Sequence, residues 1–175
     1  VMWMYSDDGA ARVYKNCPLK NINPKGWVDP YRIPKYIYFL WQANYVPEPM
    51  VFIHPHHWQK NYIGTRHDII IDSNCDEVTL FVNNKKIGTG YPDKENFHII
   101  KFDNVLVQKG TLKAIGKKTG KEKECILPMA GKAVSLRLKA SHNEIQAARS
   151  SVVSVTVDAV DNKGIQVQGL SQPLD

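Results

Sequence analysis

Apolar and polar residues alternate with a period of two along much of the chain after residue 49. The alternation is clearest in 78–82 and 134–138, where Val or Leu stands at every second position. Successive side chains of a strand point to opposite faces, so this pattern predicts strands with one buried face. Seven segments fit it: Met50–Ile53, Asp68–Asp72, Glu77–Asn83, Phe97–Phe102, Thr111–Ile115, Lys123–Leu127 and Val134–Leu138.

Residues that favour turns separate these segments. They are Ser73-Asn74, Asn83-Asn84, Gly88–Gly90, Lys109-Gly110 and Lys118-Thr119-Gly120. Seven short strands within about 90 residues are typical of an antiparallel sandwich of the immunoglobulin type. The order of cysteine, tryptophan and cysteine that marks antibody domains is absent. We therefore predict an immunoglobulin-like β-sandwich over residues 47–140.

Helical spacing precedes this region. Tyr38, Trp41 and Tyr45 recur on one face, with Ile37 and Leu40 beside it. Proline disrupts a helix interior, so the helix is predicted to begin at Pro34. A face this wide and aromatic needs a large surface to pack against. The first 28 residues offer none, since 1–8 predict a short buried strand and 9–28 a long loop.

A second alternating segment lies near the carboxyl end. Residues 141–151 are polar and predict a linker, whereas 152–160 alternate and lead through Asp161–Gly164 into Ile165–Val167. This pattern predicts a hairpin. Because two strands are rarely stable alone, residues 152–175 are interpreted as the start of a second, incomplete β-sandwich.

Charge and cysteines narrow the range of functions. The net charge is +6, and lysines concentrate between residues 109 and 123, where glycines and glutamates interrupt them. Such a segment is typical of solvated hairpins, and no nucleic-acid partner is expected. No apolar run approaches the roughly 20 residues of a membrane span. Cys17, Cys75 and Cys125 lack metal-ligand spacing and are expected to be buried thiols.

A cluster of histidines invites a metal site. His54 and His56 would point to the same side of a strand, and His57 and Trp58 follow them. Zinc needs one or two further ligands, and no other pair of residues is spaced to supply them. We therefore expect no metal and no cofactor. Packing and hydrogen bonding at a domain junction, with Trp58 as an anchor, is the favoured role of this cluster.

Several motifs occur in a fixed order along the chain. They are Trp3 with Tyr5-Ser6-Asp7, Gly26–Asp29, Arg32–Trp41, Pro49–Val51, Pro55–Trp58, Ser73–Asn83, Gly110–Ala114, Ala130–Lys132 and Val152–Gly164. Taken together, the set resembles the carboxyl-terminal part of glycoside hydrolases of family two, the β-galactosidase and β-glucuronidase group. The family often has Asp-Gly where Ala148-Arg149-Ser150 stands here, and residues 166–175 match no motif.

The resemblance implies a fold and a set of roles. Enzymes of this family couple a (β/α)8 barrel to β-sandwiches, so residues 1–46 correspond to the last β/α unit of a barrel. The expected fold class is mainly β, an immunoglobulin-like antiparallel sandwich preceded by a barrel remnant with one α-helix. Trp3 corresponds to a tryptophan that commonly lines the sugar-binding end, and packing in the barrel core is the alternative for it.

The catalytic glutamates of the family come from earlier barrel strands, so no catalytic residue is expected in this chain. Its own glutamates are predicted to be solvated acids: Glu48, Glu77, Glu95, Glu122, Glu124 and Glu144. By resemblance, the chain is a non-catalytic accessory region of a β-galactosidase-like enzyme that hydrolyses glycosidic bonds with retention. Its structural role would be to support the barrel.

The same resemblance implies the rest of the barrel and an oligosaccharide substrate as partners, is compatible with a homo-oligomer, and favours an exported or periplasmic bacterial protein. The alternative function is a stand-alone carbohydrate-binding or adhesion module, with Tyr62, Tyr91 and Phe97 as candidate contacts. A metal-dependent enzyme built on His54, His56 and His57 is the least favoured interpretation.

Overall fold

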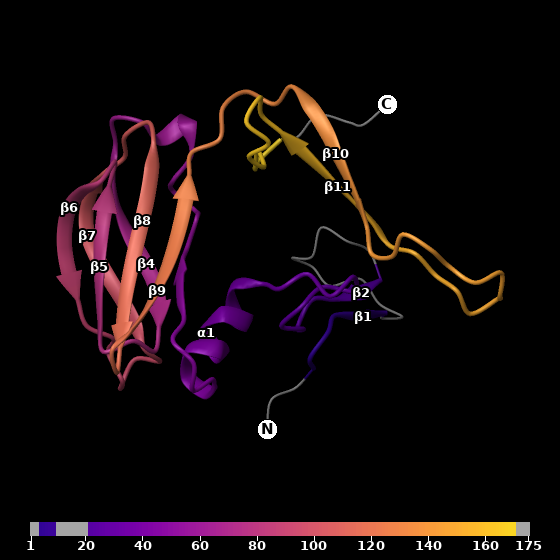
Figure 1. Ribbon diagram of the computed structural model, residues 1–175, viewed down its shortest axis with the longest axis horizontal. Helices are drawn as coiled ribbons and strands as arrows, with labels where there is room; N and C mark the ends of the chain where they lie inside the picture. The colour runs from indigo at the N-terminus through magenta and orange to yellow at the C-terminus, as the bar shows by residue number, and fades with distance from the viewer. Residues whose placement is uncertain (1–3, 10–20, 171–175) are drawn as a thin grey trace.

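The computed structural model describes residues 4–9 and 21–170 (Figure 1). Seven strands form two antiparallel sheets that face each other, one with the order β3-β4-β7 and the other with the order β6-β5-β8-β9. The strands are β3 (Val51–Ile53), β4 (Arg66–Ser73), β5 (Glu77–Val82), β6 (Lys85–Gly90), β7 (Ile99–Leu106), β8 (Thr111–Lys118) and β9 (Lys121–Pro128). A short 3-10 helix, η1 (Lys60–Tyr62), lies between β3 and β4. The predicted sandwich is thereby confirmed.

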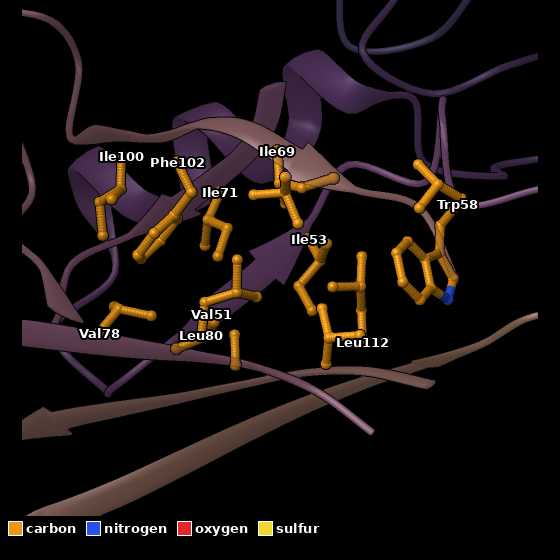
Figure 2. Packing of buried hydrophobic residues seen from close by; sticks show 14 of the residues in the cluster. Val51, Ile53, Trp58, Ile69, Ile71, Val78, Leu80, Ile100, Phe102 and Leu112 are labelled. Carbon is orange, nitrogen blue, oxygen red and sulfur yellow. The ribbon is translucent and has the colours of Figure 1, made fainter. Parts of the chain in front are cut away.

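The core lies between the two sheets. The alternation predicted for β5 is confirmed, since Val78, Leu80 and Val82 are buried while their neighbours are partly exposed. These side chains meet apolar residues of the facing sheet, and Trp58 closes one end beside Ile53 and Leu112 (Figure 2). Burial of such apolar surface is the main favourable contribution to folding.

Strand β6 was not predicted, because its glycines indicated a turn. Gly90 lies against the opposite sheet, where a β-carbon would be 2.5 Å from Ile100 Cγ2 and 3.1 Å from Phe102 Cζ. Glycine in a strand often marks such a close approach. The turn predicted at Asn83-Asn84 is confirmed, and both residues have positive φ (49° and 66°), as tight hairpins require.

The strand predicted at 134–138 forms, as β10 (Ser135–Ala140), but its assignment to the first sandwich was wrong. It pairs in a separate two-stranded sheet with β11 (Val155–Val160), and the expected linker 141–151 lies in the loop between them. The backbone N–H of Gly131 donates to the Asp161 carboxylate at 2.8 Å, a contact that holds the start of this sheet beside the end of β11. The domain boundaries themselves stay a prediction.

The segment before the sandwich contains short strands and one helix. Strand β1 (Asp8–Gly9) pairs with β2 (Ile22–Asn23), and Val28 bridges both Ser6 and Pro34. Helix α1 (Tyr36–Tyr45) begins two residues after the predicted start, because Pro34 belongs to that bridge. Trp3 and Cys17 lie outside the described residues. Across 4–9 and 21–170, the helices are too short or too polar to cross a membrane.

Candidate functional site

Helix α1 carries a stack of aromatic rings on the face that points away from the sandwich. Trp41 lies between two partners: its ring is 5.4 Å from that of Trp27, with an interplanar angle of 4°, and 5.0 Å from that of Tyr45. These residues and Tyr38 line an open, apolar hollow of about 430 Å³. Tyr45 is 73% exposed. No described part of the chain covers this aromatic face.

The opposite side of α1 is docked on the sandwich. Phe39 stacks on Phe52 of β3 with ring centroids 3.7 Å apart. At the carboxyl end of the helix, Asn44 donates to the carbonyl oxygen of Phe97 at 2.9 Å, and its own carbonyl oxygen contacts His98 Nδ1 at 3.0 Å. Apolar stacking and polar contacts together fix the helix to the three-stranded sheet.

The side chain of Asn74 makes three hydrogen bonds to the connection between α1 and β3. The amide nitrogen of Asn74 donates to the carbonyl oxygens of Val46 (2.6 Å) and Glu48 (2.8 Å), and its oxygen accepts from the N–H of Met50 at 2.9 Å. Ser73 adds a hydrogen bond to the Met50 carbonyl oxygen. This short connection therefore has little freedom to swing the helix relative to the sandwich.

A buried acid organises the segment that leads into α1. Asp7 is 9% exposed, accepts a hydrogen bond from the N–H of Gly26 at 2.8 Å, and pairs with the Lys35 ammonium at 2.5 Å. Asp7 follows Trp3 closely in sequence, but Trp3 lies outside the described residues. Its two proposed roles, sugar platform and core packing, both stay predictions.

Four histidines gather beside the amino end of α1. His54 and His56 both contact the Tyr36 ring, at centroid distances of 5.2 and 4.4 Å, so their predicted common side is confirmed. His57 stacks on His67 of β4 at 4.1 Å and 15°. Sequence spacing did not reveal His67, because it enters the cluster from a neighbouring strand. We call these four residues the histidine cluster.

One histidine of the cluster is bonded to a buried carboxylate. His54 Nε2 lies 2.9 Å from Asp72 Oδ2, and Asp72 is fully buried. The pKa of His56 is lowered, first by burial and then by the nearby His54 and His57. Within the described residues, no three histidine, cysteine or acidic side chains are grouped closely enough to hold a metal ion.

The glutamates and one buried aspartate show what the acidic side chains do in the described residues. Each of the six glutamates is exposed or half-buried, as predicted. Asp161 is buried and accepts hydrogen bonds from the N–H groups of Gly131, Lys163 and Ile165, which lower its pKa. Its stabilising contribution is therefore present above the ordinary aspartate range and is lost as the pH falls. Asp161 is a structural anchor of the turn after β11.

The aromatic residues considered for glycan binding do not form one surface. Tyr62 packs against His57, His67 and the sandwich core. Tyr91 and Phe97 are exposed in the loop between β6 and β7. Isolated exposed aromatic side chains are common on protein surfaces and do not indicate a binding site.

Comparison with known proteins gives the context of this geometry. Residues 64–124 match the family described as "Domain of unknown function (DUF4982)", which falls inside the sandwich. The chain is 38% identical over 115 residues to a β-glucuronidase of Formosa agariphila, covering 65% of this chain and 11% of that protein. It is 33% identical over 147 residues to the β-galactosidase BoGH2A of Bacteroides ovatus, covering 79% and 16% respectively.

Solved structures agree with these matches. A β-glucuronidase from glycoside hydrolase family 2 superposes with a TM-score of 0.79 at 31% identity, over 94% of this chain and 17% of that chain. A β-glycosidase from Bacteroides vulgatus gives 0.73 at 28% identity, over 83% and 19%. The chain spans less than a quarter of the length of the curated relatives that it matches. The predicted resemblance is confirmed: in sequence and in fold, the chain is similar to the carboxyl-terminal part of family 2 glycoside hydrolases.

Proposed function

We propose that this chain is a non-catalytic accessory region of a β-galactosidase-like enzyme that hydrolyses glycosidic bonds with retention, and that it supports the barrel of that enzyme. The observation that carries the proposal is the two-sided character of α1. One side is fixed to the sandwich, whereas the other presents stacked aromatic rings that nothing in the described chain covers.

The aromatic face is more stable when it is buried against the surface of a barrel than when it is exposed to solvent. Large aromatic side chains contribute strongly to stability when they are buried, and offset stacking adds to that contribution. Trp41 and Tyr45 would pack against the remaining helices and strands of the barrel. The sandwich, through Phe52 and Asn74, would hold the last helix in one orientation. A rigid contact of this kind keeps the last β/α unit in register with the rest of the barrel.

The catalytic groups belong to the rest of that enzyme in this proposal. Retention requires two carboxyl groups about 5–5.5 Å apart, and all six glutamates of this chain face solvent at least in part. Trp3 is proposed as an aromatic platform for the sugar at the end of the last barrel strand. The substrate is an oligosaccharide, and the glutamates that cleave it come from earlier strands.

Further features of the enzyme follow the same resemblance. The sheet of β10 and β11 carries Leu136, Leu138, Val155 and Val157 on one face, and each of these is at least 44% exposed. We assign it to the opening of a second β-sandwich. Because the family degrades external glycans, the enzyme is expected to be exported or periplasmic in a bacterium. A homo-oligomer is compatible with this arrangement.

The isolated chain tests the proposal. We expect it to hydrolyse no aryl β-galactoside or β-glucuronide, and to bind a dye whose fluorescence rises on apolar surfaces. The double substitution Trp41→Gln with Tyr45→Gln removes the centre of the aromatic face, so it should lower the dye signal by about half. The remaining signal would come from the apolar face of β10 and β11.

Tyr91→Gln is the matched control. Tyr91 is 69% exposed, like Tyr45, but it lies in the loop between β6 and β7 and is not part of the aromatic face of α1. It should leave the dye signal unchanged. Measurable hydrolysis by the purified chain, or equal dye binding by the double variant and the unmodified chain, would contradict the proposal.

A further inference from the structure

The histidine cluster lies where α1 meets the sandwich. His54 is on the connection that leaves β3, with His56 and His57 after it, and His67 is on β4. Tyr36, the first residue of α1, rests against both His54 and His56. A change of charge on His54 or His56 therefore acts directly on the contact between the helix and the sheet.

Neighbouring imidazole rings are close enough to interact when charged. The centroids of His54 and His56 are 5.9 Å apart, those of His56 and His57 are 6.4 Å apart, and those of His57 and His67 are 4.1 Å apart. Histidine gains its positive charge in the range between about pH 5 and pH 8. Like charges at such separations repel one another appreciably near a protein surface.

We propose that the histidine cluster makes the docking of α1 acid-sensitive, so that the helix loosens from the sandwich as the pH falls from about 7.5 to about 5. The proposal goes beyond the supporting role given above. It concerns contacts within the described chain, so it stands whether or not a barrel covers the aromatic face.

Among the described charged groups around the cluster, only Asp72 is placed to offset a charge, and it does so for His54, so the repulsion that remains is among His56, His57 and His67. From β4, Asp72 is bonded to His54, and Arg66 adds a further positive charge to the pocket. Asp68 lies near His57, but its carboxylate binds Lys101 of β7 at 2.7 Å, and Asp103 binds the same ammonium group. From α1, the cluster faces the phenol of Tyr36.

The direction of the effect follows from His56. Its pKa is lower in the folded chain than in a free histidine, because of burial and then of the charges on His54 and His57. As the pH falls, the unfolded or undocked chain therefore takes up a proton before the docked chain does. Neutral His56 therefore stabilises docking at neutral pH, and this stabilisation is lost on acidification.

Hydrogen exchange tests the proposal on the full chain. The quantity to compare is the protection factor of each amide of α1, which corrects for the dependence of intrinsic exchange on pH. Between pH 7.5 and pH 5 we expect protection in α1 to fall by about fivefold, while β5 and β8 change by less than about twofold. In His56→Gln the fall in protection should be smaller. In the double variant His56→Gln with His57→Gln it should disappear.

Two histidines outside the cluster provide controls. His142, in the loop between β10 and β11, contacts Ser141, so His142→Gln should keep the fall. His98 touches α1 through Asn44, so His98→Gln tests whether the effect arises there instead. The proposal is overturned by unchanged protection in the unmodified chain, by an equal fall in His56→Gln and its double variant, or by loss of the fall in His98→Gln.

Discussion

Replacing Gly26 by alanine is expected to detach the amino-terminal segment from α1 and to cost about 3 kcal/mol or more in the free energy of unfolding of that segment. A β-carbon at residue 26 would overlap the backbone nitrogen of Asp7 and lie 2.6 Å from the carbonyl oxygen of Val28. These are backbone atoms that cannot move aside, so the chain itself would have to shift. The hydrogen bond from Gly26 to Asp7 would be lost with it.

The stacked indoles provide the measurement. Trp27 follows Gly26 directly and lies parallel to Trp41, so displacement of the segment should abolish the near-ultraviolet circular dichroism that the pair produces. Gly9→Ala is the matched control, because no atom lies within 4 Å of a β-carbon at that position. A Gly26→Ala chain with the unmodified spectrum and stability would show that the contact between the segment and the helix is not as described.

The second large effect is expected from Asn74→Ala, which should lower the free energy of unfolding by about 2–3 kcal/mol. The substitution removes three hydrogen bonds to the backbone of the connection between α1 and β3. A typical hydrogen bond contributes about 1 kcal/mol, and a buried group left without a partner costs more. Denaturant unfolding followed through the buried Trp58 would give the total loss of stability.

Hydrogen exchange of α1 would show where that loss occurs. Without the Asn74 side chain the connection can swing, so the helix amides should lose protection before those of β5. Asn143→Ala, in the exposed loop between β10 and β11, should change neither quantity. If Asn74→Ala leaves both the stability and the helix protection unchanged, the side chain is not what fixes the helix.

Sequence patterns predicted the sandwich because its strands carry their own signal. In β5 and β8, apolar residues at every second position face the core, and the periodicity alone reveals them. Strand β6 gave no such signal. Gly90 is required by a close approach to Ile100 and Phe102 of the facing sheet, and the local sequence does not reveal this contact.

The sequence pattern also did not predict which strands pair with each other. The pattern of β10 indicates a strand, but it does not say which strand lies beside it. Its partner is β11, and Asp161, directly after β11, accepts a hydrogen bond from the backbone N–H of Gly131, which lies before β10. Strand pairing is determined by contacts between residues that are distant in the chain. Periodicity describes only residues that are close together in the sequence.

In the candidate site, too, local patterns were predicted from the sequence and contacts between distant residues were not. The aromatic spacing of α1 predicted a face that needs a partner surface, and the structure has Trp41 and Tyr45 on such a face. Three of the four members of the histidine cluster could be predicted, because His54, His56 and His57 lie close together in the sequence. His67 joins them only through the pairing of β3 with β4.

The intact mass of the polypeptide that contains these residues, measured in its native source, tests the central claim most directly. Our account predicts a mass several times 19.9 kDa, because the aromatic face of α1 and the catalytic carboxylates both require the rest of a glycosidase. A mature product with a mass near 19.9 kDa would contradict it. The resemblance would then reflect ancestry alone, and the chain would act without a barrel.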